Sequence, residues 1–130
     1  MADKPETRTG LPRIIAAWGY SLAGLSFALR RETPFRQECL LYLLLLGVLP
    51  FLPIPGLFKL VLLALNTLVL IVELLNSAIE KVVDLASPGY HHLAKQAKDL
   101  GSAAVLLALL LALVGWMVAL TKVWMGCGLP

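Results

Sequence analysis

Charged residues are scarce in this sequence: only 15% of its 130 residues are Asp, Glu, Lys or Arg, against about a quarter in ordinary soluble domains. Hydrophobic residues make up 59% of the chain, and its mean hydropathy is +0.84. A soluble domain of this length has no interior large enough to hide so much apolar surface. The composition therefore excludes an ordinary soluble protein and favours an integral membrane protein.

The sequence also lacks a set of cysteines that could pair and a P-loop for nucleotide binding. The sequence has only two cysteines, Cys39 and Cys127, which are expected near opposite faces of a membrane. They cannot pair within one chain, and they indicate neither a disulfide framework nor a metal knuckle. No Gly-x-x-x-x-Gly-Lys-Ser/Thr loop is present, so any nucleotide would be held by side chains and not by a P-loop.

Three apolar stretches are long enough to cross a membrane. The hydrocarbon core is about 30 Å thick, so a spanning helix needs roughly 20 mostly apolar residues. The stretches are residues 35–52, between Pro34 and Pro53, residues 57–84 and residues 97–121. The second overshoots the bilayer by about two turns or more, so its polar end must emerge or lie in a protein-lined cleft. The sequence predicts an all-α membrane protein with three transmembrane helices.

The N-terminal part is expected to lie outside the bilayer. Residues 1–11 are polar and are predicted to be disordered, and residues 12–125 are predicted to form a single domain. Within residues 12–32, apolar side chains recur at spacings of three and four, which predicts an amphipathic helix on the membrane surface. Gly19 and Gly24 are the positions at which this helix is expected to break, if it is interrupted. These apolar residues are Ile14, Trp18, Leu22, Leu25 and Leu29.

The distribution of basic residues predicts the orientation in the membrane. Nine of the eleven Lys and Arg lie before or just inside the start of the first span, or in and beside the connection between the second and third spans; only Lys59 and Lys122 lie elsewhere. By the positive-inside rule, the N-terminus and the second connection are cytoplasmic. The net charge of +3 thus reflects residues beside the membrane, which suit anionic lipid headgroups better than nucleic acid.

A row of polar side chains marks the cytoplasmic end of the second span. The spacings of three, one, three and four residues put them on one helical face that begins inside the hydrophobic boundary. Ionisable residues in such a place cost free energy unless they lie in a polar cleft, so we expect them to be functional. The row consists of Glu73, Asn76, Ser77, Glu80 and Asp84.

Two further polar sets are expected at the same depth if the three helices pack together. Carboxylates with Lys and Asn form the oxygen-rich, partly cationic surroundings that a magnesium nucleotide requires. One set, around the start of the third span, is Lys95, Lys98, Asp99 and Ser102; the other, around the start of the first span, is Glu32, Arg36, Gln37 and Glu38.

Three runs of residues resemble motifs of the prokaryotic diacylglycerol kinase family, and the resemblance covers about residues 12–120. The runs are Phe-Arg-Gln-Glu at 35–38, Glu-Leu-Leu-Asn-Ser-Ala-Ile-Glu at 73–80 with Val-Asp at 83–84, and Ala-Lys-Asp-Leu-Gly-Ser-Ala-Ala-Val at 97–105. The resemblance implies a homotrimer in the bacterial inner membrane with one active site per subunit. It implies an enzyme of phospholipid metabolism that transfers the γ-phosphoryl group of ATP to diacylglycerol, with Mg²⁺ as cofactor.

The same resemblance assigns roles to individual residues. It makes Glu73 the general base, and Glu32 and Glu80 the magnesium ligands. Glu73 is also the acid placed nearest the depth at which a glyceride hydroxyl is anchored, which favours it as the base on physical grounds. The resemblance further implies contacts to substrate or nucleotide from Arg13, Gln37, Glu38, Asn76, Asp84, Lys98, Asp99 and Ser102.

Other functions are compatible with parts of this pattern. An undecaprenol kinase would share the fold and the motifs and differ in the lipid alcohol. A small proton-coupled transporter would use an intramembrane glutamate, but one near mid-bilayer, whereas Glu73 lies towards one end of a span. A purely structural or pore-forming peptide would not need an acidic row beside lysines.

Overall fold

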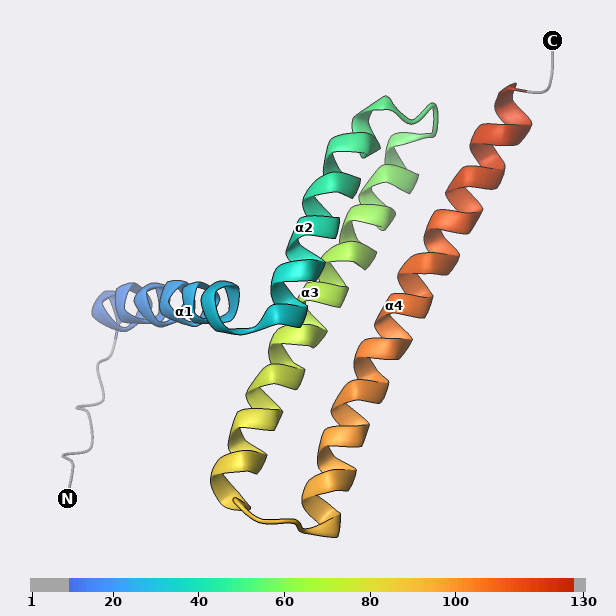
Figure 1. The fold of residues 1–130 in the computed structure, drawn as a ribbon. Coiled ribbons are helices and arrows are strands. Elements are labelled where there is room, and N and C mark those ends of the chain that lie inside the picture. Colours follow the sequence, from blue (N-terminus) through green and yellow to red (C-terminus); the bar gives the residue numbers. More distant parts are fainter. Residues whose placement is uncertain (1–9, 128–130) are drawn as a thin grey trace.

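The computed structural model describes residues 10–127, and these form four α-helices and one short 3-10 helix. The helices are α1 (Leu11–Arg31), α2 (Thr33–Val48), η1 (Leu49–Phe51), α3 (Gly56–Ala86) and α4 (His92–Cys127). Helices α2, α3 and α4 run alongside one another, and α1 projects crosswise from the start of α2 (Figure 1). The predicted all-α fold is confirmed.

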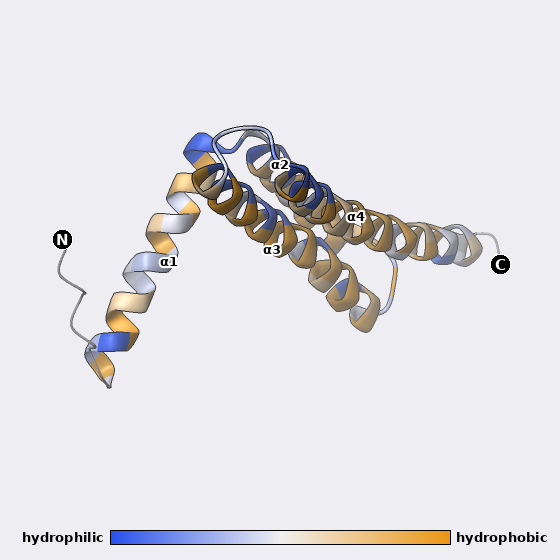
Figure 2. Ribbon diagram, turned by 90° about the horizontal axis from the view of Figure 1, so that it is seen from below, coloured by the Kyte–Doolittle hydropathy of each residue, from blue (hydrophilic) through white to orange (hydrophobic). Residues whose placement is uncertain are grey.

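Three of these helices are long and apolar enough to cross a membrane: Thr33–Phe51, Gly56–Ala86 and His92–Gly126. They are hydrophobic along most of their length, whereas α1 is mixed in character (Figure 2). The 31 residues of α3 and the 36 of α4 give lengths of about 46 and 54 Å, well beyond the roughly 30 Å of the hydrocarbon core. Both helices are therefore longer than one crossing of the hydrocarbon core requires.

Some helix ends differ from those expected from the sequence. Helix α2 stops at Val48, because Pro50 lacks an amide hydrogen, and the chain continues as a 3-10 turn to Phe51. Helix α1 is continuous through both of its internal glycines, and α4 begins at His92, before the predicted start. Most of the predicted disordered segment 1–11 lies outside the described residues, and Leu11 already belongs to α1.

A single extended residue makes the corner between α1 and α2. Glu32 has φ −101° and ψ 108°, so it interrupts the helix and turns the chain. Ala28 and Phe35 on either side of it are buried, which fixes the corner against the bundle. The corner consequently holds the Glu32 side chain close to α3.

The seam between α3 and α4 is built from large side chains on α3 and small ones on α4. The buried residues of α3 recur at spacings of four and three, and those of α4 continue the same seven-residue repeat. In lipid the hydrophobic effect does not drive helices together, so they associate through close packing. Small residues allow the two backbones to approach closely enough for that packing. The buried α3 residues are Leu62, Asn66, Val69, Glu73 and Asn76; the α4 side holds Gly101, Ala108, Ala112 and Ala119.

The sequence suggested a strip of alanines repeating every four residues on the third span. Ala108 and Ala112 do lie in the seam, but Ala104 is exposed. A strict four-residue step drifts around a helix, whereas alternating steps of three and four stay on one side.

Polar groups within the spans are paired between helices. The Trp116 indole Nε1 donates to Asn66 Oδ1 at 3.2 Å, which links α4 to α3. The Tyr42 hydroxyl lies 3.2 Å from the Thr67 hydroxyl, which links α2 to α3. Each pair satisfies groups that lipid cannot solvate, so the pairs stabilise the packing of the three helices.

Replacing Ala112 by Leu should destabilise the fold, because the added carbon atoms must displace Val69 across the seam. Overpacking of this kind costs about 1–3 kcal/mol. Denaturation of the detergent-purified protein, followed by circular dichroism, measures the effect. Ala104→Leu is the matched control and should change stability by less than about 0.5 kcal/mol. Equal destabilisation by both variants would contradict the seam described here.

Candidate active site

The centre of the candidate site is a buried polar stretch on α3. The side chains of Glu73 and Asn76 lie in the seam, with 4% and 9% of their residue surfaces exposed. Asn76 Nδ2 donates to Glu80 Oε1 at 3.3 Å, so the amide and the second carboxylate are held together one turn apart. Glu73 lies within electrostatic range of Glu38, Glu80 and Glu32. Three of the predicted site residues on α3 therefore form one continuous polar surface.

Helix α4 approaches this surface most closely at Gly101. A Cβ atom at residue 101 would overlap Asn76 Oδ1, so glycine is required by the position of the amide. Among residues 10–127, no donor bonds to this buried Oδ1. A buried acceptor without a partner costs free energy and usually has a functional reason.

Glu32 reaches the same region from the corner between α1 and α2. Its Oε1 lies 2.7 Å from Lys81 Nζ on α3. The same ammonium group lies 5.9 Å from the centre of the Phe27 ring on α1. A cavity of about 440 Å³ beside this pair is lined by residues of both helices. The ion pair thus joins the crosswise helix to the acidic face of α3.

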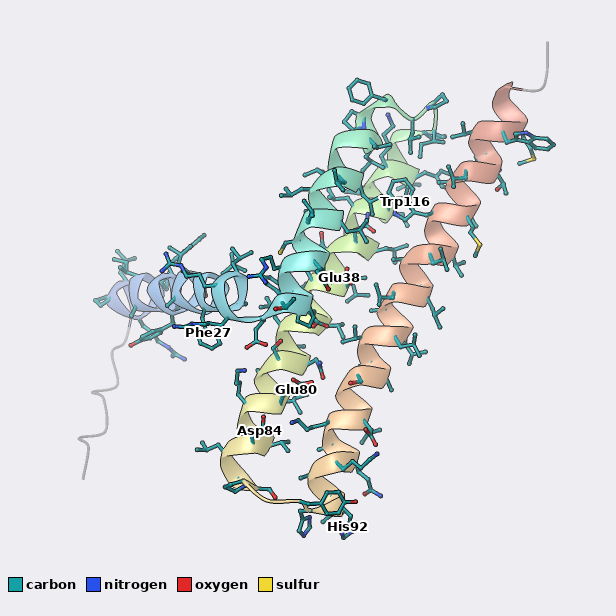
Figure 3. All side chains as sticks on the ribbon, viewed as in Figure 1. Phe27, Glu38, Glu80, Asp84, His92 and Trp116 are labelled. Atoms are coloured by element: carbon teal, nitrogen blue, oxygen red, sulfur yellow. The ribbon has the colours of Figure 1, made fainter. Side chains whose placement is uncertain are left out.

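Two further ion pairs lie closer to the α3–α4 loop. Lys98 Nζ lies 2.7 Å from Asp84 Oδ1 and so connects α4 to α3. Lys95 Nζ lies 2.6 Å from Asp99 Oδ2 one turn along α4. Glu80 and Asp84 follow one another along the lower part of α3, with His92 at the start of α4 beyond them (Figure 3). Lys98 also lies within electrostatic range of Glu80, so its charge faces the candidate site.

Glu38 marks the entrance of a second cavity, between α2, α3 and α4. This cavity has a volume of about 400 Å³, and its walls are mostly apolar. Tyr42, one turn after Glu38 along α2, also lines it, together with Asn66 of α3 and Trp116 of α4. The cavity therefore leads from the acidic cluster towards the interior of the bilayer.

Four predicted site residues are not gathered into this cluster within one chain. Gln37, Asp99 and Ser102 are exposed. Arg13 lies near the far end of α1, about 27 Å along that helix from its last residue, where it lines a shallow hollow formed by α1 alone. Their predicted contacts to substrate or nucleotide remain predictions.

The residues present fit a magnesium ion held together with a nucleotide. Among the described residues, no three His, Cys, Asp or Glu side chains form a metal-binding group. Magnesium does not need such a group, because it takes one or two carboxylates and keeps water or phosphate oxygens as its other ligands. Glu32 and Glu80 offer carboxylates on neighbouring elements, and Asn76 Oδ1 offers a buried neutral oxygen.

The family model described as prokaryotic diacylglycerol kinase matches residues 19–120. The chain belongs to this kinase family. A diacylglycerol kinase of Escherichia coli (strain K12) is 46% identical over 112 residues, which cover 86% of this chain and 92% of the relative. One from Pseudomonas aeruginosa is 49% identical over 109 residues, covering 84% and 89%, and one from Haemophilus influenzae is 41% identical over 108 residues, covering 83% and 92%.

Family membership confirms the resemblance drawn from the three motifs, and with it an enzyme of the phosphotransferase class. Two residues of the candidate site were nevertheless not predicted from the sequence. Lys81 is a lone cation within the acidic row of α3, which could have identified it as a partner for an acid. Gly101 lies within a quoted motif, but only the packing of α4 on α3 shows what it contacts.

Replacing Gly101 by Ala should reduce phosphoryl transfer by about tenfold or more, since displacement of a positioning group by a fraction of an ångström lowers rates strongly. The new methyl group must push the Asn76 amide away and break its bond to Glu80. Kinetic assays in mixed micelles measure the loss. Gly47→Ala on α2 is the control, because nothing lies within 4 Å of its Cβ position. Full activity of Gly101→Ala would show that Asn76 need not stay in place.

Proposed function

We propose that this protein phosphorylates diacylglycerol with ATP, forming phosphatidic acid at the cytoplasmic face of the membrane. The observation that carries the proposal is the burial of Glu73 on α3, in one polar surface with Asn76 and Glu80. Glu73 lies 17 residues beyond Gly56, or about 26 Å along the helix, which is near the inner edge of a roughly 30 Å hydrocarbon core. A glyceride hydroxyl is held at this depth by its acyl chains.

Glu73 acts as the general base in this proposal. It accepts the proton of the glyceride hydroxyl while the hydroxyl oxygen bonds to the γ-phosphorus of ATP. The bond from that phosphorus to the β,γ-bridging oxygen breaks, and ADP leaves. Asn76 Oδ1 is an acceptor beside the reacting groups, and the hydrogen bond that Nδ2 of the same amide donates to Glu80 Oε1 fixes its orientation. Positioning and charge stabilisation account for most of the catalysis of phosphoryl transfer.

Side chains hold the nucleotide, because the chain has no P-loop. Glu32 and Glu80 hold Mg²⁺, which when bound neutralises negative charge on the phosphates. Lys98 supplies a fixed positive charge near Glu80, and Asp84 orients that lysine through their 2.7 Å ion pair. Arg13, Gln37, Asp99 and Ser102 are proposed to contact nucleotide or lipid, and Arg13 would have to do so in a neighbouring subunit.

The protein is proposed to lie in the bacterial inner membrane with its N-terminus and the α3–α4 loop in the cytoplasm. The basic residues before α2 and around this loop support the orientation. Helix α1 would lie on the membrane surface, since it is mixed in hydropathy and projects crosswise from the spans (Figures 1 and 2). A homotrimer would cover part of the apolar surface that α3 and α4 expose in a single chain.

An undecaprenol kinase is the alternative that this geometry accommodates best. The second cavity, with Glu38 at its entrance, could accept either lipid chain, because its walls are mostly aliphatic. The position of Glu73 near one membrane face argues against a proton-coupled transporter, which would place its acid near mid-bilayer.

The substrate can be identified by offering diacylglycerol and undecaprenol in parallel mixed micelles with magnesium ATP. Transfer mainly to diacylglycerol is expected. Preference for undecaprenol would be consistent with the proposed mechanism but would identify undecaprenol as the substrate. Absence of transfer to either alcohol by a folded oligomer would overturn the proposed activity.

Glu73→Gln should lower kcat by about 100-fold or more, because removing a general base typically costs that much and the amide cannot accept the proton. The variant should remain a folded oligomer, since glutamine has nearly the same shape. Initial rates at saturating lipid and ATP measure the loss, and size-exclusion chromatography in detergent checks assembly. Retention of most activity would remove Glu73 as the base.

A further inference from the structure

Lys81 is a basic residue of α3 beside the candidate site, and the resemblance assigns it no role. Its ammonium group is 2.7 Å from Glu32 Oε1 and within electrostatic range of Glu80 and Asp84. It therefore faces both carboxylates proposed to bind magnesium. A cation in this place must affect how a metal ion binds.

The side chains of Glu32 and Lys81 differ in how freely they can move. The Glu32 side chain is only 13% exposed and is fixed at the corner between α1 and α2. The Lys81 side chain is 56% exposed, and it carries its charge on a flexible four-carbon stem. The cavity of about 440 Å³ beside the pair leaves room for the stem to turn. Lys81 is thus the member of the pair that can move.

A divalent cation and the ammonium group cannot both bind Glu32 Oε1. The oxygen is already in charge-assisted contact with Lys81, and two cations at one carboxylate oxygen repel each other strongly. The phosphates of a nucleotide offer Lys81 another anionic partner. Arrival of the metal together with the nucleotide therefore removes the repulsion, whereas arrival of the metal alone does not.

We propose that Lys81 is a positioning residue that competes with the divalent cation for Glu32 and transfers to the nucleotide phosphates when metal and nucleotide bind together. It holds the Glu32 carboxylate in place and makes metal binding depend on nucleotide. The inference rests on the proposed function, in which Glu32 is a metal ligand. It adds a coupling between the two ligands, which is reciprocal by thermodynamic linkage.

Direct binding of Mn²⁺ to the full-length protein in detergent tests this coupling without an activity readout. The free Mn²⁺ signal in electron paramagnetic resonance is titrated with and without β,γ-methylene ATP, after correction for the metal bound by the free nucleotide. Without nucleotide, Lys81→Met should bind Mn²⁺ about threefold to fivefold more tightly than the unaltered protein, the factor expected from losing a partly exposed ion pair. The increase in Mn²⁺ affinity produced by the nucleotide should shrink by a similar factor. Lys81→Arg should behave like the unaltered protein.

Two further variants separate the possible outcomes. Lys122→Met removes the same charge from the far end of α4 and should leave Mn²⁺ affinity unchanged. Glu32→Gln should weaken Mn²⁺ binding, and adding Lys81→Met to it should have no further effect. If Glu32→Gln weakens Mn²⁺ binding but Lys81→Met does not tighten it, Lys81 does not compete with the metal, and Glu32 is still supported as a metal ligand. If Glu32→Gln leaves binding unchanged, Glu32 is not a ligand, and this part of the proposed function fails together with the inference.

Discussion

The burial of a carboxylate in a membrane-spanning helix is the constraint on which the rest of the structure depends. Lipid cannot solvate Glu73 or Asn76, so α3 must turn its polar residues towards protein and not towards the acyl chains. The seam with α4 provides that protein surface. Its α4 side consists of Gly and Ala because larger side chains would separate the helices and open the polar residues to lipid. The packing of the two longest helices and the chemistry of the site therefore have one cause.

The corner at Glu32 reduces the electrostatic repulsion that arises when several acids are buried near one another. Acids brought together near a membrane boundary repel one another, and each of them loses hydration. Glu32 enters the cluster from a separate element and brings its own counter-ion contact with Lys81. Asp84 and Lys98 form an equivalent pair between α3 and α4. The negative charge is thus divided between α3 and its neighbours, with Lys81 beside Glu32 and Lys98 beside Asp84. Within residues 10–127, no ion pair joins Glu73 or Asn76 to a cation.

The sequence predicted the broad fold and the polar face of α3 because both depend on local patterns. Apolar length gives the spans, and the spacing from Glu73 to Asp84 gives the polar face of α3. Contacts between helices were harder to predict. The pairing of Glu32 with Lys81 depends on how the corner folds back on α3, and the closeness of Gly101 to Asn76 depends on the register of α4. Helix ends were also missed, because a single proline such as Pro50 shifts the last turn without changing the hydropathy of the span.

The two buried asparagines of α3 illustrate how structural and functional polar groups can be distinguished. Both lie in the α3–α4 seam. The Asn66 oxygen accepts a hydrogen bond from Trp116, so its presence is explained by helix packing alone. The Asn76 oxygen has no donor within residues 10–127, although its amide group is fixed by Glu80 and its position requires glycine on α4. A group that is fixed in place yet unsatisfied destabilises the fold, and binding a donor or a cation would recover that free energy. This difference favours a place for Asn76 in the candidate site, whereas Asn66 serves to hold the helices together.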